Sequence, residues 1–135
     1  MVKHRVICPY CNKIVDKNNH DCPVLKKIKN KKAKEYQKNE EWSAKELTSQ
    51  KWRNYRKMII LRDRGICQRC KYLLGINNSD NLEIHHIRPR IKYPELMYDD
   101  NNVITLCKQC NDHLGLNGLD FDWKPQQADW LDPKI

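Results

Sequence analysis

Three Cys-x-x-Cys pairs restrict the fold of this chain more than any other feature of its sequence. The pairs are Cys8–Cys11, Cys67–Cys70 and Cys107–Cys110. Two residues between cysteines let both sulfurs converge on one tetrahedral ion, so this spacing is typical of zinc sites. Disulfides are the competing explanation. The odd number of cysteines, seven, and the absence of an apolar secretion signal in MVKHRVICPY argue against them.

The chain needs such staples because its apolar content is low. Of its 135 residues, 39% are hydrophobic and 32% are charged, whereas a typical globular chain has roughly 45–50% apolar residues. A domain of this composition buries only a modest core. No apolar run approaches the roughly 18 residues of a membrane span, so we expect a soluble, cytoplasmic protein without membrane contacts.

The cysteines group into two four-ligand sites. The inner pairs form a structural zinc quartet of Cys67, Cys70, Cys107 and Cys110. The N-terminal stretch offers three sulfurs and one imidazole for a second structural zinc, from Cys8, Cys11, His20 and Cys22. Closed sites of this kind stabilise folding and leave no open coordination position. Any catalytic residues must therefore lie elsewhere.

Positive charge is concentrated in one segment. Residues 24–64 contain 14 Lys or Arg and 5 Asp or Glu, whereas residues 65–135 contain 8 and 10. The segment lacks Gly and is rich in Lys, Glu, Gln, Leu and Ala, which favour helix. A basic helix is typical of proteins that bind phosphate backbones. For a lysine run alone, a merely solvated helix face is an equally good interpretation.

The two halves of this basic segment differ. In the second half, residues recur at helical spacing, which predicts a helix: Trp52, Tyr55, Arg56, Ile59 and Ile60. Trp52, Tyr55 and Ile59 are expected to be core anchors and not ligand contacts. Thr48 or Ser49 is expected to cap this helix and Gly65 to end it. The first half, residues 24–48, has too few apolar positions to dock firmly. We expect it to be mostly helical, with its lysine-rich part extended, mobile or turned toward DNA.

Two short strands and a helix are expected between and after the inner cysteine pairs. Residues 82–85 alternate as a strand does, and residues 103–106 fit a second strand. A helix should start near Lys108. With zinc at both ends this is a treble-clef-like ββα unit. Adjacent residues of a regular strand point to opposite faces, so His85 and His86 cannot play the same part.

With these elements in place, the chain resembles the HNH endonucleases, the ββα-metal nucleases, and especially the small ones of phages that infect Gram-positive bacteria. The resemblance covers residues 49 to about 116. It rests on KWRNYRKMIILRDRGICQRC, the paired histidines, Asn102 and LCKQCN. It implies a small α+β protein with a zinc-stapled ββα-metal core, to which the composition of the preceding residues adds an N-terminal zinc knuckle and a basic helical arm.

The resemblance also implies residue roles. His86 would be the general base and His85 a ligand of the catalytic metal, while Asn102 would hold the loop that orients the base. Asn111 stands where the family usually has His and would be the second ligand. His113 is a weaker candidate, as a further ligand, an outer-shell group or a DNA contact.

The expected cofactors and contacts follow from these roles. An imidazole, an amide oxygen, phosphate oxygens and waters form a rather hard ligand set, which suits Mg²⁺ or Mn²⁺ and tolerates Ni²⁺ or Zn²⁺. Basic side chains around them are expected to contact DNA phosphates, although surface residues without a role are the alternative: Arg88, Arg90, Lys51, Arg53, Arg56 and Lys57.

We expect four parts along the chain: a zinc knuckle, an arm, a nuclease domain and an acidic tail, at residues 1–23, 24–48, 49–118 and 119–135. The tail's aromatic residues are expected to pack back onto the domain: Phe121, Trp123 and Trp130.

The predicted function is a metal-dependent DNA endonuclease that nicks or cuts duplex DNA. We expect it to act in phage DNA processing or packaging, in the host cytoplasm, with a terminase as candidate partner. A non-catalytic zinc-dependent module that binds DNA or docks on the terminase is the first alternative. An RNA-processing nuclease is the second.

Overall fold

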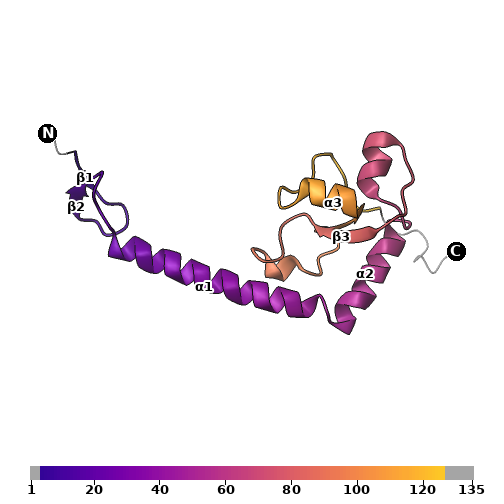
Figure 1. The fold of residues 1–135 in the computed structure, drawn as a ribbon, viewed down its shortest axis with the longest axis horizontal. Helices are drawn as coiled ribbons and strands as arrows, with labels where there is room; N and C mark the ends of the chain where they lie inside the picture. The colour runs from indigo at the N-terminus through magenta and orange to yellow at the C-terminus, as the bar shows by residue number, and fades with distance from the viewer. Residues whose placement is uncertain (1–3, 127–135) are drawn as a thin grey trace. The chain divides into compact units, whose positions relative to one another are not determined.

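A computed structural model of the chain describes residues 4–126 and consists of two compact units, residues 1–40 and 41–135. The boundary falls inside the long helix α1 (Pro23–Glu46), drawn in violet in Figure 1. Each unit is described by itself. Within the described residues, no helix combines the length and apolar character that crossing a bilayer requires. The finer division into knuckle, arm, nuclease domain and tail stays a prediction.

The first unit is a small hairpin followed by a helix. Strands β1 (Arg5–Ile7) and β2 (Ile14–Asp16) pair antiparallel, with Val6 opposite Val15. Helix α1 then runs without interruption for 24 residues and buries only Ser43 among them. The expected helix is thus present, and of the three alternatives for its lysine-rich part, extended, mobile or turned toward DNA, the extended one was wrong. With Pro at its first position and no Gly or later Pro, the segment keeps its helical propensity throughout.

The second unit opens with helix α2 (Gln50–Arg62). Ser49 caps it as predicted, because its hydroxyl accepts a 3.1 Å hydrogen bond from the Trp52 N–H. The helix ends earlier than predicted. Arg64, at φ 61°, takes the left-handed position, and the Gly65 N–H donates to the Ile60 carbonyl over 2.8 Å. The Arg64 N–H also donates to the Leu61 carbonyl over 2.9 Å. These two bonds form a Schellman motif with Arg where Gly is usual.

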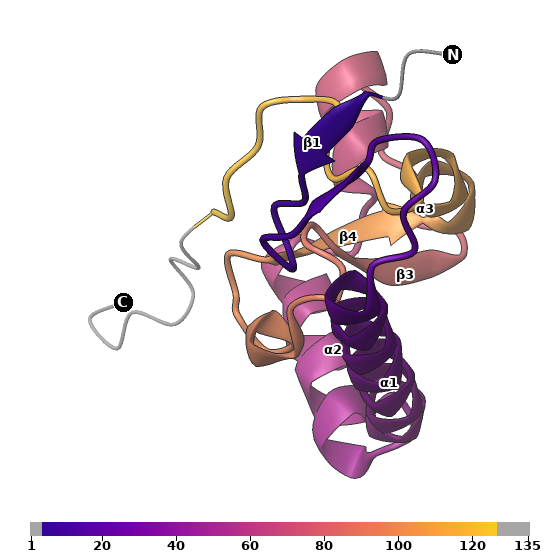
Figure 2. The same cartoon turned by 90° about the vertical axis from the view of Figure 1, so that its left-hand side faces the viewer.

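The centre of the second unit is an antiparallel strand pair. Strands β3 (Leu82–His86) and β4 (Val103–Cys107) pair with His85 opposite Ile104, and each is one residue longer than predicted. Helix α3 (Lys108–Leu114) follows β4 directly. Every residue of β4 is buried, because α2 and α3 pack on the two faces of the pair, as Figures 1 and 2 show.

The main hydrophobic core surrounds the inner cysteines. Its buried members come from both cysteine pairs, β4 and α3: Cys67, Cys70, Ile104, Leu106, Cys107, Cys110 and Leu114. A π-helical turn (Cys70–Leu74), which was not predicted, follows the first pair. Phe121 and Trp123 pack against this core, as expected of the tail. The expectation for Trp130 lies outside the described residues.

The aromatic residues of α2 lie on the other side of the strand pair. Trp52 and Ile59 are buried, as expected of core anchors. Tyr55 is half-buried, and its hydroxyl donates a 2.8 Å hydrogen bond to Asp100. A short 3₁₀ turn (Pro94–Leu96) lies in the long loop between the strands.

Candidate active site and metal centres

His86 ends strand β3 in a buried setting. Its Nε2 lies 3.0 Å from the carbonyl oxygen of Met97. A carbonyl only accepts, so Nε2 must carry the proton and donate it. The other ring nitrogen, Nδ1, is buried without a hydrogen-bond partner among the described residues. In this tautomer the Nδ1 lone pair is free to take up a proton.

Packing keeps the His86 ring neutral. The indole of Trp52 stacks on it with ring centroids 5.3 Å apart and planes 25° from parallel. Burial disfavours the charged imidazolium and lowers the pKa of His86 to about 4. The ring therefore stays a neutral proton acceptor at physiological pH.

His85 is held by a second set of partners. Its Nδ1 lies 2.8 Å from Oδ1 of Asn111, whose amide nitrogen donates to Glu83 over 2.7 Å. Since the carboxylate can only accept, it fixes which end of the amide faces the histidine. Nδ1 of His85 therefore donates, and its buried Nε2 keeps a free lone pair. Burial also lowers the pKa of His85.

Asn102 ties down the loop that carries the Met97 carbonyl. Its side-chain oxygen accepts from the Arg88 N–H at 2.8 Å, and its amide nitrogen donates to the carbonyls of Arg88 and Leu96, each at 3.2 Å. Asn102 is itself buried. The predicted role for this residue, holding the loop that orients the base, therefore has a specific set of contacts behind it.

One cleft of about 400 Å³ joins the two histidines. Its lining includes His85, His86, Asn111 and Arg90. The Arg90 guanidinium donates to the hydroxyl of buried Ser43, and burial lowers its pKa. No carboxylate pairs with Arg90 in the described part of the chain. The cleft is thus lined by two neutral histidines, each with one buried ring nitrogen without a partner, and by a cation that suits a phosphate.

The other predicted DNA contacts lie outside this cleft and differ in their surroundings. Arg56 donates to the Leu82 carbonyl over 2.8 Å and so helps to hold β3. Arg53 donates to Gln50, and Lys51 lies over the Tyr98 ring at 4.1 Å. Arg88 stacks over Tyr93, and Lys57 is exposed.

His113 does not line the cleft of the paired histidines. Its Nε2 lies 4.0 Å from Asp120, and its side chain is 65% exposed. This position leaves the interpretations as a ligand or an outer-shell group without geometric support.

The inner cysteines converge as a four-sulfur cluster. Ligand atoms of Cys67, Cys70, Cys107 and Cys110 all lie within 4.8 Å of one another, and all four residues are buried. The backbone N–H of Cys70 donates to the Cys67 sulfur and that of Cys110 to the Cys107 sulfur. All seven cysteines are free, so none forms a disulfide. Buried, crowded sulfurs with amide donors are a suitable cage for a cation.

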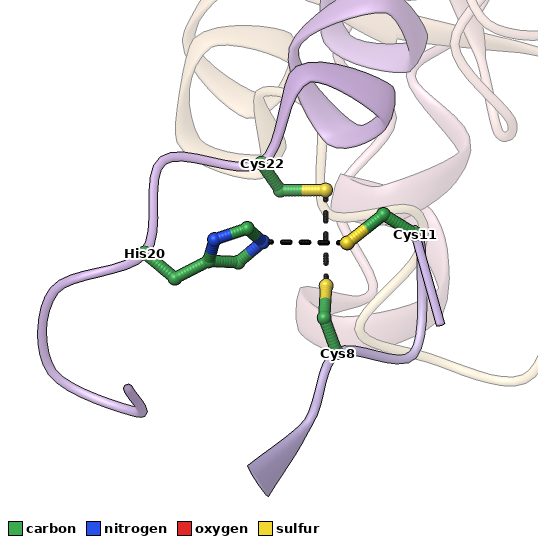
Figure 3. Close-up of side chains that lie close together, drawn as sticks. All are labelled: Cys8, Cys11, His20 and Cys22. Atoms are coloured by element: carbon green, nitrogen blue, oxygen red, sulfur yellow. Dashed lines mark hydrogen bonds between the residues drawn. The ribbon is translucent and has the colours of Figure 1, made fainter. Parts of the chain in front are cut away.

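The N-terminal cysteines converge in the same way with one imidazole. Figure 3 shows the side chains of Cys8, Cys11, His20 and Cys22 pointing toward a common centre. The Cys8 and Cys22 sulfurs are 3.7 Å apart, and the Cys11 sulfur lies 3.5 Å from His20 Nε2. Both predicted ligand sets are thus brought together by the fold.

The sequence did not predict two residues that contact the side chains of the cleft. Glu83 orients Asn111, and Trp52 stacks on His86 instead of serving the core alone. A signal for Glu83 was present, because a residue two before His85 in a strand shares its face. No comparable signal existed for the stack, which joins residues 34 positions apart in sequence.

Comparisons with known proteins agree with this geometry. Residues 67–115 match the family described as HNH endonuclease. No curated protein matches the chain. Among solved structures, the crystal structure of the HNH endonuclease of the deep-sea thermophilic bacteriophage GVE2 with manganese ion is similar. The sequence identity is 22%, the match covers 61% of this chain and 87% of that chain, and the TM-score is 0.53. The small α+β fold is therefore HNH-like, as predicted.

Proposed function

We propose that this chain, whose residues 67–115 match the HNH endonuclease family, is a metal-dependent DNA endonuclease. The observation that carries the proposal is the pair of free imidazole nitrogens, on His85 and His86, in residues that line one cleft. Neither hydrogen bonding nor protonation occupies these lone pairs. An RNA-processing nuclease would need the same chemistry, so substrate choice is tested below.

In this proposal His86 is the general base. Its Nδ1 takes the proton of the attacking water, while the Met97 carbonyl holds the Nε2 proton in place. Positioned general bases contribute typically 10²–10⁴-fold to rate. Asn102 acts through the loop and not on the substrate, since its contacts are all with backbone groups of that loop.

His85 and Asn111 fit a divalent cation. The two candidate ligand atoms that converge are His85 Nδ1 and Asn111 Oδ1, 2.8 Å apart. Both would bind one cation once the ring proton moves to Nε2, the nitrogen without a partner. This set with waters and phosphate oxygens favours Mg²⁺ or Mn²⁺ over softer ions, although Ni²⁺ or Zn²⁺ is tolerated. A bound cation of this kind stabilises the charge that develops on the phosphate and its leaving oxygen. The manganese of the phage GVE2 enzyme supports this choice by likeness of fold.

Arg90 is the proposed phosphate contact inside the cleft, because its guanidinium lacks a carboxylate partner among the described residues. Fixed cations of this kind meet developing negative charge without reorganisation. Arg88, Lys51, Arg53 and Lys57 are proposed to contact phosphates nearby. For Arg56 the contact with Leu82 leaves fewer free donors.

Structural zinc is proposed for both cysteine clusters. The mutual distances and burial of the inner sulfurs, and the convergence in Figure 3, support this assignment. With zinc, the second unit has the zinc-stapled, treble-clef-like core that the sequence predicts. A place in phage DNA processing or packaging, beside a terminase, is proposed by analogy with the phage origin of the similar structure.

A plasmid-cleavage assay with Mg²⁺, Mn²⁺, Ni²⁺ and Zn²⁺ tests the function. The wild type should nick or cut plasmid DNA, and His86→Ala should lose about 10²–10⁴-fold in rate while keeping its fold. His113→Ala is the matched control, because it removes an exposed imidazole outside the cleft. Wild-type cleavage by His86→Ala would refute the assigned base.

The same assay separates the alternatives. Absence of cleavage with every ion, together with salt-sensitive DNA binding, would favour the non-catalytic module. Preferential cleavage of RNA in a parallel reaction would favour the RNA-processing nuclease.

A further inference from the structure

The first unit holds most of the positive charge but none of the cleft residues. Residues 1–40 contain 11 Lys or Arg and 4 Asp or Glu, a net charge of +7. Residues 41–135 contain 15 and 13, a net charge of +2. The charge that would attract a nucleic acid therefore lies mainly in a unit that has no part in the proposed chemistry.

Helix α1 arranges part of this charge on one face. At about 100° per residue, side chains three or four positions apart share a face. Four lysines with this spacing fall within an arc of roughly 60°, and we call them the lysine stripe: Lys27, Lys31, Lys34 and Lys38. All four are exposed, and within the described residues none forms an ion pair with a carboxylate.

A solvated face without a ligand would be expected to carry balancing acids. Helices that are stable in water commonly place Glu beside Lys at these spacings. Between Lys27 and Lys38 the helix has a single acid, Glu35, which lies four residues after Lys31. It forms no ion pair with a stripe lysine in the described part of the chain, so one acid stands against four lysines. The stripe is thus a row of like charges whose mutual repulsion a row of phosphates would relieve.

The form of the stripe favours duplex DNA over single strands. Proteins that bind single strands stack bases on aromatic side chains. The one aromatic residue between Lys27 and Lys38 is Tyr36, which lies about 180° from Lys27, on the opposite face. Ammonium groups without aromatic neighbours suit the regular phosphates of a duplex and carry no base-edge readout.

We propose that the lysine stripe of α1 binds the phosphate backbone of duplex DNA, as a contact surface separate from the cleft. This inference extends the proposed nuclease function, and it assigns sequence-independent anchoring to the first unit. The ligand class is a row of phosphodiesters on a duplex.

A matched pair of triple variants of the full chain tests the proposal. Lys27, Lys31 and Lys34 are replaced by Gln in one variant, and Lys26, Lys29 and Lys32 in the other. Both variants remove three charges from the same helix at little cost in helix propensity. The second set lies on the opposite half of the helix. Binding to a fluorescent 20-base-pair duplex is measured by anisotropy over a range of NaCl concentrations without added Mg²⁺ or Mn²⁺.

The stripe variant should bind more weakly at each salt concentration. Its slope of log Kobs against log[salt] should be smaller by up to about 3, because each phosphate contact contributes about 0.9. The control variant should change the slope by less than about 0.9, the value of one phosphate contact. Equal losses in both variants, no loss in either, or a loss confined to a single-stranded probe would overturn the proposal.

This test is independent of catalysis. If the chain cleaves no DNA with any ion but the stripe variant loses slope, the nuclease proposal fails and the stripe stands. If cleavage depends on His86 and both variants bind like the wild type, only the stripe is refuted.

Discussion

At His86 a single backbone carbonyl decides which ring nitrogen can act. Met97 accepts from Nε2, so the proton-accepting nitrogen is Nδ1. At His85 the same decision is made by two side chains in series, because Glu83 orients Asn111 and Asn111 fixes the ring. Neighbouring histidines on one strand thus acquire different free nitrogens from different partners.

Glu83→Gln should weaken metal binding more than it weakens folding. A glutamine can present its amide nitrogen to Asn111, which would remove the reason for that amide's orientation. Outer-shell changes of this kind typically cost 10–100-fold in metal affinity or activity. The expected result is a higher Mn²⁺ concentration for half-maximal cleavage, with partial recovery at high Mn²⁺.

Glu95→Gln serves as the control for this variant, because Glu95 is an exposed carboxylate of the loop between the strands. An unchanged Mn²⁺ requirement in Glu83→Gln would show that Asn111 keeps its orientation without the carboxylate.

The buried imidazole of His86 should make folding stability depend on pH. Its pKa is about 4 in the folded chain because burial penalises the charged form, against about 6.5 when unfolded. Between these values the unfolded chain binds more protons, so stability is full above pH 6.5 and falls as pH falls toward 4. The loss should reach about 2 kcal/mol near pH 4.5.

Urea titrations of the wild type and His86→Asn at pH 7 and pH 4.5 measure this loss. Both proteins carry the same cysteine clusters, so acid release of bound metal cancels in the comparison. A stability difference between them that is constant with pH would contradict the assignment of the shift to burial.

At the scale of single residues, the groupings that could be predicted were those between residues close together in the sequence. The ligand sets of both cysteine clusters could be read from spacing, because two-residue gaps fix where sulfurs meet. The paired histidines were singled out through the family resemblance, and their catalytic roles stay predictions. The stack of Trp52 on His86 was not predicted, because it depends on how α2 packs on β3.

At the scale of elements, the ends of α2 show where sequence patterns work and where they fail. Ser49 was predicted as its cap and is one. Gly65 was expected to end the helix, and its N–H does close the helix end. Both Arg64 (φ 61°) and Gly65 (φ 66°) are left-handed, and Arg64 comes first. The Schellman motif needs two consecutive residues beyond the cap, and composition alone favoured the glycine. The lysine-rich part of α1 is also helical. Its few apolar residues suggested that it would not pack, but helix propensity is enough to keep it helical.

Arg64→Gly should stabilise the second unit. Arg64 is exposed, and a side chain in the left-handed region costs roughly 1–2 kcal/mol that glycine avoids. The greater freedom of glycine in the unfolded chain offsets part of that gain. A net increase of about 0.5–1 kcal/mol in the free energy of unfolding is expected.

Urea denaturation followed by tryptophan fluorescence in the presence of Zn²⁺ measures this increase. Arg64→Ala is the control, since it removes the side chain but keeps the left-handed strain. A similar gain in Arg64→Ala would point to the charge instead of the backbone.

For the whole molecule, the division into two units was the least predictable feature. Its boundary lies inside α1 at residues 40 and 41, where helix propensity continues without a break. The boundaries expected from the sequence, at residues 23/24, 48/49 and 118/119, stay predictions. The two cysteine clusters fall in different units, so each unit has its own candidate metal.

Metal content should report on the units separately. Elemental analysis of the purified wild type should find about two zinc ions per chain, one for each cluster. Cys11→Ser should reduce the value to one and leave cleavage of a short duplex intact. Cys107→Ser should instead unfold the second unit, because its cluster is part of that unit's core.

Near-ultraviolet circular dichroism distinguishes these two variants, since buried Trp52 lies in the second unit. One zinc per wild-type chain would remove the N-terminal site from the account.

The contacts of Arg69 determine how far the chain can be truncated from its C-terminus. Arg69 forms a 2.8 Å ion pair with Asp120 and also donates to the sulfur of Cys110. The matched family segment stops at residue 115. A truncation there would remove Asp120, the carboxylate that holds Arg69 beside the Cys110 sulfur. A shortened gene product meant for expression should therefore retain the chain through Trp123, whose indole reaches Gln68.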